Sequence, residues 1–185
     1  MFEVELRYSL RSLEVPEICQ RLTELAFVHH ADLIQRDIYY TSRYKDMIES
    51  EECLRIRTVD GESEITWKPP STREMQCADA FWKREIDLPV GRHGPVAEEL
   101  LEMLDFVQYC IVEKKRRLFI RFADQVEAAV DDVTGCGFFI ELEKKSSEVE
   151  EAQMCLDELA KRLQLKKSSI SKTPYRDIVK GAARE

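Results

Sequence analysis

The sequence predicts an α+β fold built on an antiparallel sheet of about eight strands with helices between them. Charged side chains alternate along several short segments, of which Glu3-Val4-Glu5-Leu6-Arg7 is the first. Residues two apart in a strand point to the same face, so each such segment presents one charged face. The connections look like hairpins or short helical excursions, which favours antiparallel pairing over βαβ units.

The strands are predicted from alternation and from their content of β-branched and aromatic residues. They are expected at residues 2–10, 28–41, 53–59, 63–68, 81–88, 107–122, 126–133 and 138–144, the sixth as one long strand or two shorter ones. Asp60-Gly61 is a strong turn signal that joins the third and fourth strands as a hairpin. Pro69-Pro70 ends the fourth strand, and the polar segment up to Ala78 is predicted to be a loop.

Helical spacing of apolar residues predicts four helices. They are expected at residues 15–25, 95–104, 149–163 and 171–180. Pro16 stands near the start of the first helix, where its missing N–H is tolerated. Thr173 and Pro174 open the short final helix. The predicted strands are therefore interspersed with single helices.

The chain of 185 residues is predicted to form one domain that spans residues 1–185. A domain of this size buries roughly 70% of its unfolded surface, which is enough for a well-packed core. Hydrophobic residues make up 44% of the chain and charged residues 35%, a heavy load of charge for a folded protein. The net charge of −8 argues against broad binding to a nucleic-acid backbone, although a local basic pocket remains compatible with it.

Six scattered cysteines without a CxxC pair indicate reduced thiols, as expected in the cytoplasm. The three histidines do not complete a zinc site with them. No basic segment followed by an apolar one precedes the first strand, so a secretory leader is not expected. Apolar runs are also too short to span a bilayer. We therefore expect a cytoplasmic protein without a membrane partner.

Acidic and basic side chains are predicted to lie on different strands. The acids are concentrated in the first strand and in Glu141-Leu142-Glu143. The bases alternate in other segments, at Arg55, Arg57, Lys68, Lys114 and Arg116. A solvated strand face explains any one motif, but such a face would mix the two signs because like charges repel. If the charged faces converge, they enclose a cavity suited to a polyanion and its metal ion.

The chemistry of such a cavity follows from its side chains. Arginine binds phosphate oxygens in a bidentate manner, and lysine adds a compact positive charge. Mg²⁺ prefers carboxylate oxygens together with phosphate oxygens and waters. Phosphoryl transfer mainly requires positioning and neutralisation of charge, so these groups suffice without a covalent nucleophile. Asp131-Asp132 precedes the turn that leads to Glu141, so one of its carboxylates is expected to join the metal site.

Ordered motifs along nearly the whole chain carry a resemblance to a known family. They are Glu3 to Arg7, Asp37 to Tyr40, Leu54 to Arg57, Thr66 to Pro70, Val112 to Arg117, Val130 to Val133, Gly135 to Glu143 and Lys172 to Ile178. Together they resemble the CYTH superfamily, whose members include class IV adenylyl cyclases and thiamine triphosphatases. The order of the motifs and the two C-terminal segments look closest to the class IV cyclase-like branch.

The resemblance implies an eight-stranded antiparallel β-barrel, a tunnel for a triphosphate, with helices packed outside. The implied phosphate-binding residues are Arg7, Arg55, Arg57, Lys68, Lys83, Lys114, Arg116 and Lys172. The implied ligands for Mg²⁺ or Mn²⁺ are Glu141 and Glu143, helped by Glu3, Glu5 and Asp131. The implied catalytic residues are Glu3, Glu5 and Arg7. Resemblance to the class IV cyclases also implies a homodimer.

Two positions depart from the family pattern or are ambiguous in register. Arg7 replaces the lysine of the Glu-x-Glu-x-Lys signature. Arginine stays protonated, so we expect Arg7 to act as an electrostatic clamp and any base to be a carboxylate. The motif register places Lys83 in the tunnel and Arg84 outside, whereas a slip of one residue would exchange them.

Four functions follow from these observations. The first is a metal-dependent cyclase in which the 3′-hydroxyl of ATP attacks the α-phosphate and releases pyrophosphate. The second is a triphosphatase that hydrolyses tripolyphosphate, thiamine triphosphate or a nucleoside triphosphate. The third is a protein that binds an organic polyphosphate without turnover, and the fourth is a barrel whose charged faces are merely solvated. All but the last predict a small-molecule triphosphate as the partner.

Overall fold

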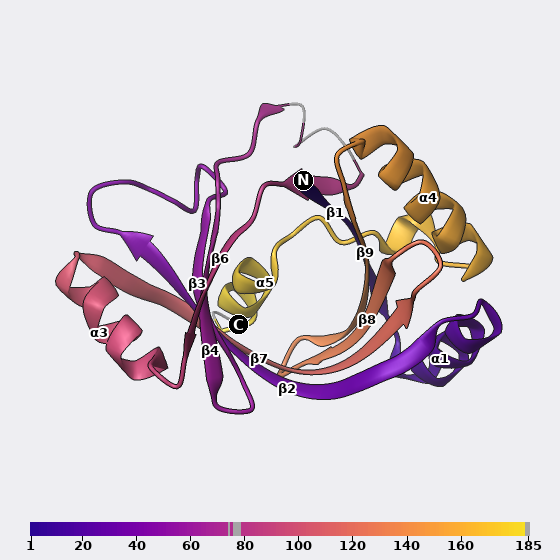
Figure 1. The fold of residues 1–185 in the computed structure, drawn as a ribbon, viewed down its shortest axis with the longest axis horizontal. Helices are drawn as coiled ribbons and strands as arrows, with labels where there is room; N and C mark the ends of the chain where they lie inside the picture. The colour runs from indigo at the N-terminus through magenta and orange to yellow at the C-terminus, as the bar shows by residue number, and fades with distance from the viewer. Residues whose placement is uncertain (74, 76–78, 184–185) are drawn as a thin grey trace.

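The computed structural model, which describes residues 1–73, 75 and 79–183, contains one strongly curled antiparallel sheet (Figure 1). The strands follow the order β5-β1-β9-β8-β7-β2-β3-β4-β6. Their bounds are β1 (Phe2–Leu10), β2 (Val28–Ser42), β3 (Cys53–Val59), β4 (Glu62–Lys68), β5 (Phe81–Lys83), β6 (Ile86–Gly91), β7 (Phe106–Arg121), β8 (Val126–Val133) and β9 (Gly137–Ser146). The predicted α+β class with an antiparallel, barrel-like sheet is confirmed.

Over the described residues the sheet has nine strands rather than eight, because the strand predicted at 81–88 is two strands. β5 pairs with β1, where Lys83 lies opposite Glu3, whereas β6 pairs with β4 at the other edge of the sheet. Arg84 and Glu85 carry the chain from one edge to the other. The alternation of side chains continues through Arg84 and Glu85, so the sequence pattern does not reveal that the strand ends there. The crossing also brings the two edges of the curled sheet together at residues 84–85.

Helices cover the sheet on its outer side, with one exception. α1 (Val15–Glu24) and α4 (Val149–Arg162) lie on one half of the sheet, and α3 (Gly94–Met103) lies on the other (Figure 1). α5 (Tyr175–Ala182) was expected outside but lies within the curl, where Tyr175 is buried. In the described ranges, none of the helices is long and apolar enough to cross a membrane. The loop predicted up to Ala78 falls partly on residues 74 and 76–78, outside the described residues.

Alternation divides the side chains of each strand between the core and the concave face. Val4 and Leu6 of β1 are fully buried in the core beneath α1 and α4, together with Leu22 and Leu156. A second core beneath α3 contains Ile38, Tyr40, Leu54, Ile56, Ala97 and Leu101. Because the apolar residues of β1 face these helices, its acidic residues and Arg7 must face the hollow of the sheet.

We predict that Gly94→Ala destabilises the protein, because α3 lies very close to β4 at this residue. An added Cβ would lie 2.5 Å from Ser63 Oγ and 3.1 Å from Ser63 Cβ. Overpacking of this kind costs about 1–3 kcal/mol, which urea unfolding measures. Gly181→Ala in α5 is the matched control, because nothing lies within 4 Å of its added Cβ. Equal stability of wild type and Gly94→Ala would contradict this packing, whereas Ser63→Gly should restore the loss.

Candidate functional site

The concave face of the sheet encloses a cavity of about 400 Å³, which lies within the range of small-molecule sites. Twelve of the thirteen residues predicted for the site line it. They are Glu3, Glu5, Arg7, Arg55, Arg57, Lys68, Lys83, Lys114, Arg116, Glu141, Glu143 and Lys172. The thirteenth, Asp131, lies beneath the lining and is fully buried. The alternating charged faces therefore converge in one space instead of facing solvent.

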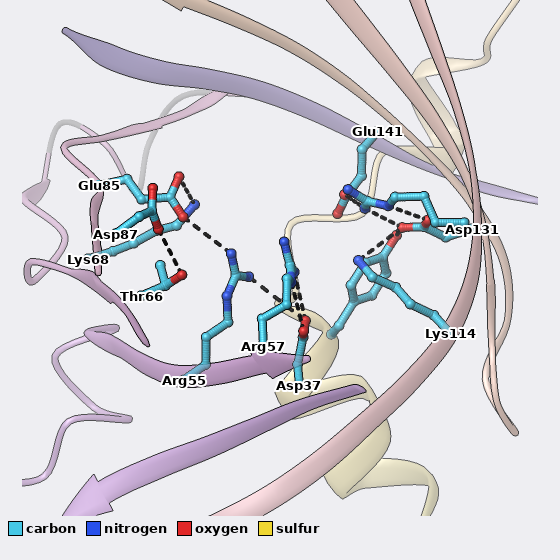
Figure 2. Close-up of polar contacts among 12 residues, drawn as sticks. Asp37, Arg55, Arg57, Thr66, Lys68, Glu85, Asp87, Lys114, Asp131 and Glu141 are labelled. Atoms are coloured by element: carbon cyan, nitrogen blue, oxygen red, sulfur yellow. Dashed lines mark hydrogen bonds and ion pairs between the residues drawn. The ribbon is translucent and has the colours of Figure 1, made fainter. Parts of the chain in front are cut away.

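Arg55 and Arg57, together with Lys114 and Arg116, form a cationic wall of the cavity. The first two contact a buried carboxylate, that of Asp37. Arg57 donates two hydrogen bonds of 2.7 Å to the two oxygens of Asp37, its neighbour across β2 and β3 (Figure 2). Burial opposes the ionisation of Asp37, but the charges of Arg57 and Arg55 hold its pKa well below the ordinary value. Arg55 makes a looser contact of 3.2 Å with Glu85, and its buried Nε has no hydrogen-bond partner in the described ranges. Arg55 therefore retains a donor for a ligand.

Asp131 is the anchor of a second cluster and not a ligand exposed to the cavity. Its oxygens accept hydrogen bonds from Arg116 at 2.7 and 2.6 Å, from Lys114 at 3.3 Å and from the Tyr175 hydroxyl at 3.0 Å (Figure 2). These donors occupy both carboxylate oxygens. The help of Asp131 in metal binding stays a prediction, and in this structure its carboxylate holds two phosphate-binding candidates, Lys114 and Arg116.

Arg7 is held on all sides by acceptors, which supports its interpretation as a clamp. Its guanidinium contacts Glu5 at 2.7 Å, Glu141 at 2.8 Å and the carbonyl of Thr173 at 2.8 Å. It also lies 4.3 Å from the centre of the Tyr175 ring, within range of a cation–π contact. Burial opposes its charge, but Glu5 and Glu141 raise the pKa of Arg7 above its ordinary value. Arg7 therefore stays protonated and cannot remove a proton from a nucleophile.

Glu141 is paired with bases, whereas Glu143, the next inward residue of β9, lies opposite other carboxylates. It accepts hydrogen bonds from Arg7 and from Arg116, and these cations, with Lys114, hold its pKa well below the ordinary value despite burial. Glu143 lies opposite Glu5 on β1 and Glu127 on β8. Burial and the charges of Glu3, Glu5 and Glu127 raise the pKa of Glu143 to about 8. Directly opposed like charges destabilise a sheet, so this row is suited to a bound cation.

The donor chemistry of Glu3, Glu5 and Glu143 fits a hard divalent cation. Glu3, Glu5 and Glu143 supply only oxygen atoms, as Mg²⁺ and Mn²⁺ prefer. In the described ranges, no three His, Cys, Asp or Glu side chains are already gathered closely enough to hold a metal ion by themselves. Mg²⁺ usually completes its shell with waters and substrate phosphates, so such a cage is not required.

The remaining predicted cations, Lys68, Lys83 and Lys172, line the same cavity. Lys68 contacts Glu3 at 2.5 Å and Glu85 at 3.4 Å, and these carboxylates raise its pKa although burial opposes the charge. Lys83 lines the cavity and donates to the carbonyl of Glu51 at 2.5 Å, whereas Arg84 is exposed. Lys172 is 45% exposed and contacts Asp79 at 3.0 Å. Lys172 therefore lies at the rim of the cavity and not at its centre.

Several lining residues were not assigned a role from the sequence. They are Gln35, Glu64, Glu85, Asp87, Glu127, Tyr175 and Arg176. Glu85 contacts Arg55 of β3, and Asp87 accepts a hydrogen bond from Thr66 of β4, so their partners come from strands distant in the sequence. Glu127 alternates with Ala129 and Asp131 in β8, so its face could have been read from the sequence. The role of Tyr175 could not be read, because it depends on the position of α5.

Comparison with known proteins relates this sequence and fold to a family. The model of the CYTH domain matches residues 1–175. A predicted adenylate cyclase of Methanocaldococcus jannaschii is 28% identical over 181 residues, which cover 96% of this chain and 98% of that protein. A structure from Pyrococcus horikoshii, PH1819, is 27% identical with a TM-score of 0.80 and covers 97% of this chain and 98% of that one.

A more distant structure shares the fold. It is an adenylyl cyclase-like protein from Hippeastrum that is described as having a dominant triphosphatase activity. It is 16% identical, has a TM-score of 0.67, and covers 97% of this chain and 95% of its own. At this identity the likeness extends to the fold alone.

We predict that Glu143→Gln stabilises the metal-free protein at alkaline pH. The folded state keeps a proton on Glu143 up to about pH 8, whereas the unfolded chain releases it near the ordinary pKa of glutamate. Stability is therefore lost as the pH rises between these values. We expect a gain of about 1–2 kcal/mol at pH 8 and little change at pH 4, measured by urea unfolding.

The control for this prediction is Glu113→Gln on the exposed face of β7. It removes the same charge without relieving the row of carboxylates. An equal gain in both variants would mean that overall net charge, rather than the row, causes the effect. A loss of stability in Glu143→Gln at pH 8 would contradict the raised pKa.

Proposed function

Because the chain belongs to the CYTH domain family, we propose that it is a metal-dependent enzyme that cleaves a triphosphate bound in its concave cavity. One observation carries the proposal: a wall of arginines and lysines faces a row of carboxylates across a single cavity. A triphosphate needs cations along its length, and the metal ion that accompanies it needs oxygen ligands. The two sides of the cavity meet these two needs.

The arginines and lysines of the cationic wall contact carboxylates of the protein, and phosphates of a ligand can take the place of these carboxylates. Without a ligand, Arg55, Arg57, Lys114 and Arg116 form ion pairs with Asp37, Glu85, Asp131 and Glu141. Burial and the charge of Arg116 lower the pKa of Lys114 to about 8. A bound phosphate would favour its protonated form, so Lys114 gains charge when the ligand needs it. The Nε of Arg55 adds a donor that no carboxylate among the described residues uses.

In the proposed reaction, Glu3, Glu5 and Glu143 would hold a divalent metal, which would supply positive charge for the phosphates. Arg7 fixes Glu5 and Glu141 and adds positive charge beside the reacting phosphate. Glu3 or Glu5 accepts the proton of the attacking hydroxyl, because a permanently protonated Arg7 cannot. Positioning and charge neutralisation then supply most of the rate enhancement.

The proposed reaction is the conversion of ATP to cyclic AMP and pyrophosphate. The Methanocaldococcus jannaschii relative, described as a predicted adenylate cyclase, supports this choice because it matches nearly the whole of both chains. Hydrolysis of a triphosphate is the second candidate, since the Hippeastrum protein with the same fold is described as dominantly a triphosphatase. The same cavity serves both reactions, which differ in whether a ribose hydroxyl or a water molecule attacks.

The deciding experiment is a product assay with ATP, thiamine triphosphate and tripolyphosphate, each with Mg²⁺ or Mn²⁺. Cyclic AMP with pyrophosphate would support the cyclase, and orthophosphate would support the triphosphatase. If none of them yields product, enzymatic activity is refuted, and thermal unfolding with each compound then tests binding. A ligand at one hundred times its dissociation constant adds about 2.7 kcal/mol to the stability.

We predict that Arg55→Gln lowers turnover by at least about 10²-fold while the fold persists, because a phosphate loses a charged donor in a desolvated site. Arg55 is the suitable cation, since its ion pairs are longer than those of Arg57 and Arg116. Arg36→Gln is the control on the outward face of the adjacent strand. If Arg55→Gln retained full turnover, the phosphates would have to bind elsewhere.

A further inference from the structure

One buried polar group in the cavity belongs neither to the cationic wall nor to the row of carboxylates. The side chain of Gln35, on β2, lines the cavity and is only 5% exposed. Its Oε1 is buried without a hydrogen-bond partner in the described part of the chain. Leaving a buried acceptor unpaired is destabilising, so this atom is expected to meet a donor from a ligand or water.

Two leucines lie farther along the same pair of strands in a cavity that is otherwise rich in charge. Leu33 precedes Gln35 by two residues and therefore points to the same face of β2. Leu118 lies on the neighbouring strand β7, where it pairs with Ala31, and is a diagonal neighbour of Leu33. Both line the same cavity as Gln35. They form an apolar patch that phosphate oxygens would not favour.

The patch adjoins the phosphate-binding wall. Leu33 lies opposite Arg116 in the register of β2 and β7, and Gln35 lies opposite Lys114. Directly opposed side chains are about 5 Å apart at Cβ, so a phosphate held by Arg116 and Lys114 would have the patch beside it. A triphosphate with an organic group could thus place that group against the leucines without leaving the wall.

The chemistry of the patch selects among organic groups. A flat ring can pack on two leucine side chains, and a primary amide offers one acceptor and two donors to the edge of a ring. A glutamine amide can pair with adjacent donor and acceptor atoms of adenine, such as its amino group and a ring nitrogen. The free Oε1 would accept from the amino group. Thiamine carries a positive charge that neither leucine nor the amide would compensate.

We propose that Gln35, Leu33 and Leu118 form a subsite for the nucleobase of a nucleoside triphosphate, with Gln35 reading an amino-bearing base such as adenine. The inference rests on the proposed function, because it assigns the organic part of a substrate whose phosphates occupy the cationic wall. It makes Gln35 a specificity-determining residue that does not act on the phosphates.

The test compares Gln35→Leu with wild type by calorimetric titration of two probes in the presence of Mg²⁺. The probes are ATP and tripolyphosphate with methylene groups in place of the bridging oxygens. We expect the dissociation constant for the ATP analogue to rise about tenfold, as for loss of a paired base contact, with that for the tripolyphosphate analogue unchanged. The apo variant should fold, because the substitution removes an unpaired buried acceptor.

Leu118→Ala should likewise weaken only the ATP analogue, and Gln108→Leu, at an exposed position of β7, is the control that should change neither probe. Equal effects of Gln35→Leu on both probes, or none on either, would overturn the base subsite while leaving triphosphate binding intact. Failure of wild type to bind either probe would instead refute the proposed function.

Discussion

Compensation of buried charge across neighbouring strands is the constraint on which the site depends. Asp37 and Asp131 are fully buried, and each is ionised only because guanidinium groups contact both of its oxygens. Removing one partner from such a pair leaves an uncompensated charge, which costs about 3–5 kcal/mol. The arginines are therefore held in place before a ligand arrives. A ligand meets a preorganised wall and does not have to order flexible side chains.

On the opposite side of the cavity, the charges of the carboxylates are not fully compensated by cations of the protein. Glu127, Glu143 and Glu5 stand side by side on three adjacent strands, so part of the row stays protonated in the metal-free protein. A sheet tolerates this arrangement because its outer face is well packed beneath α1 and α4. The stability of the core thus permits a strained charge distribution in the hollow. Functional sites are where such local conflicts are expected.

Because the sheet curls, the inward faces of its alternating strands line one cavity. Each strand separates its side chains by alternation, with apolar residues beneath the helices and charged residues inward. In a flat sheet, the inward faces of distant strands would not meet. Here the crossing from β5 to β6 and the burial of Tyr175 under the curl bring β1, β3, β7 and α5 to one cavity. Tyr175 then links Arg7, Lys114 and Asp131 through its ring and hydroxyl.

The sequence by itself indicated the antiparallel strands and their inward charged faces, because alternation is a local property that each strand carries in its own residues. The family resemblance added lining residues that alternation alone did not assign, such as Lys172. The sequence did not determine which charges pair. The break at Arg84 continued the alternation, and Asp131 carried the same local signal as a metal ligand. Gln35 has no motif, and its unpaired amide is apparent only once its neighbours are in place. Burial and partners belong to the tertiary structure, since they depend on residues far apart in the chain that approach only when the sheet curls.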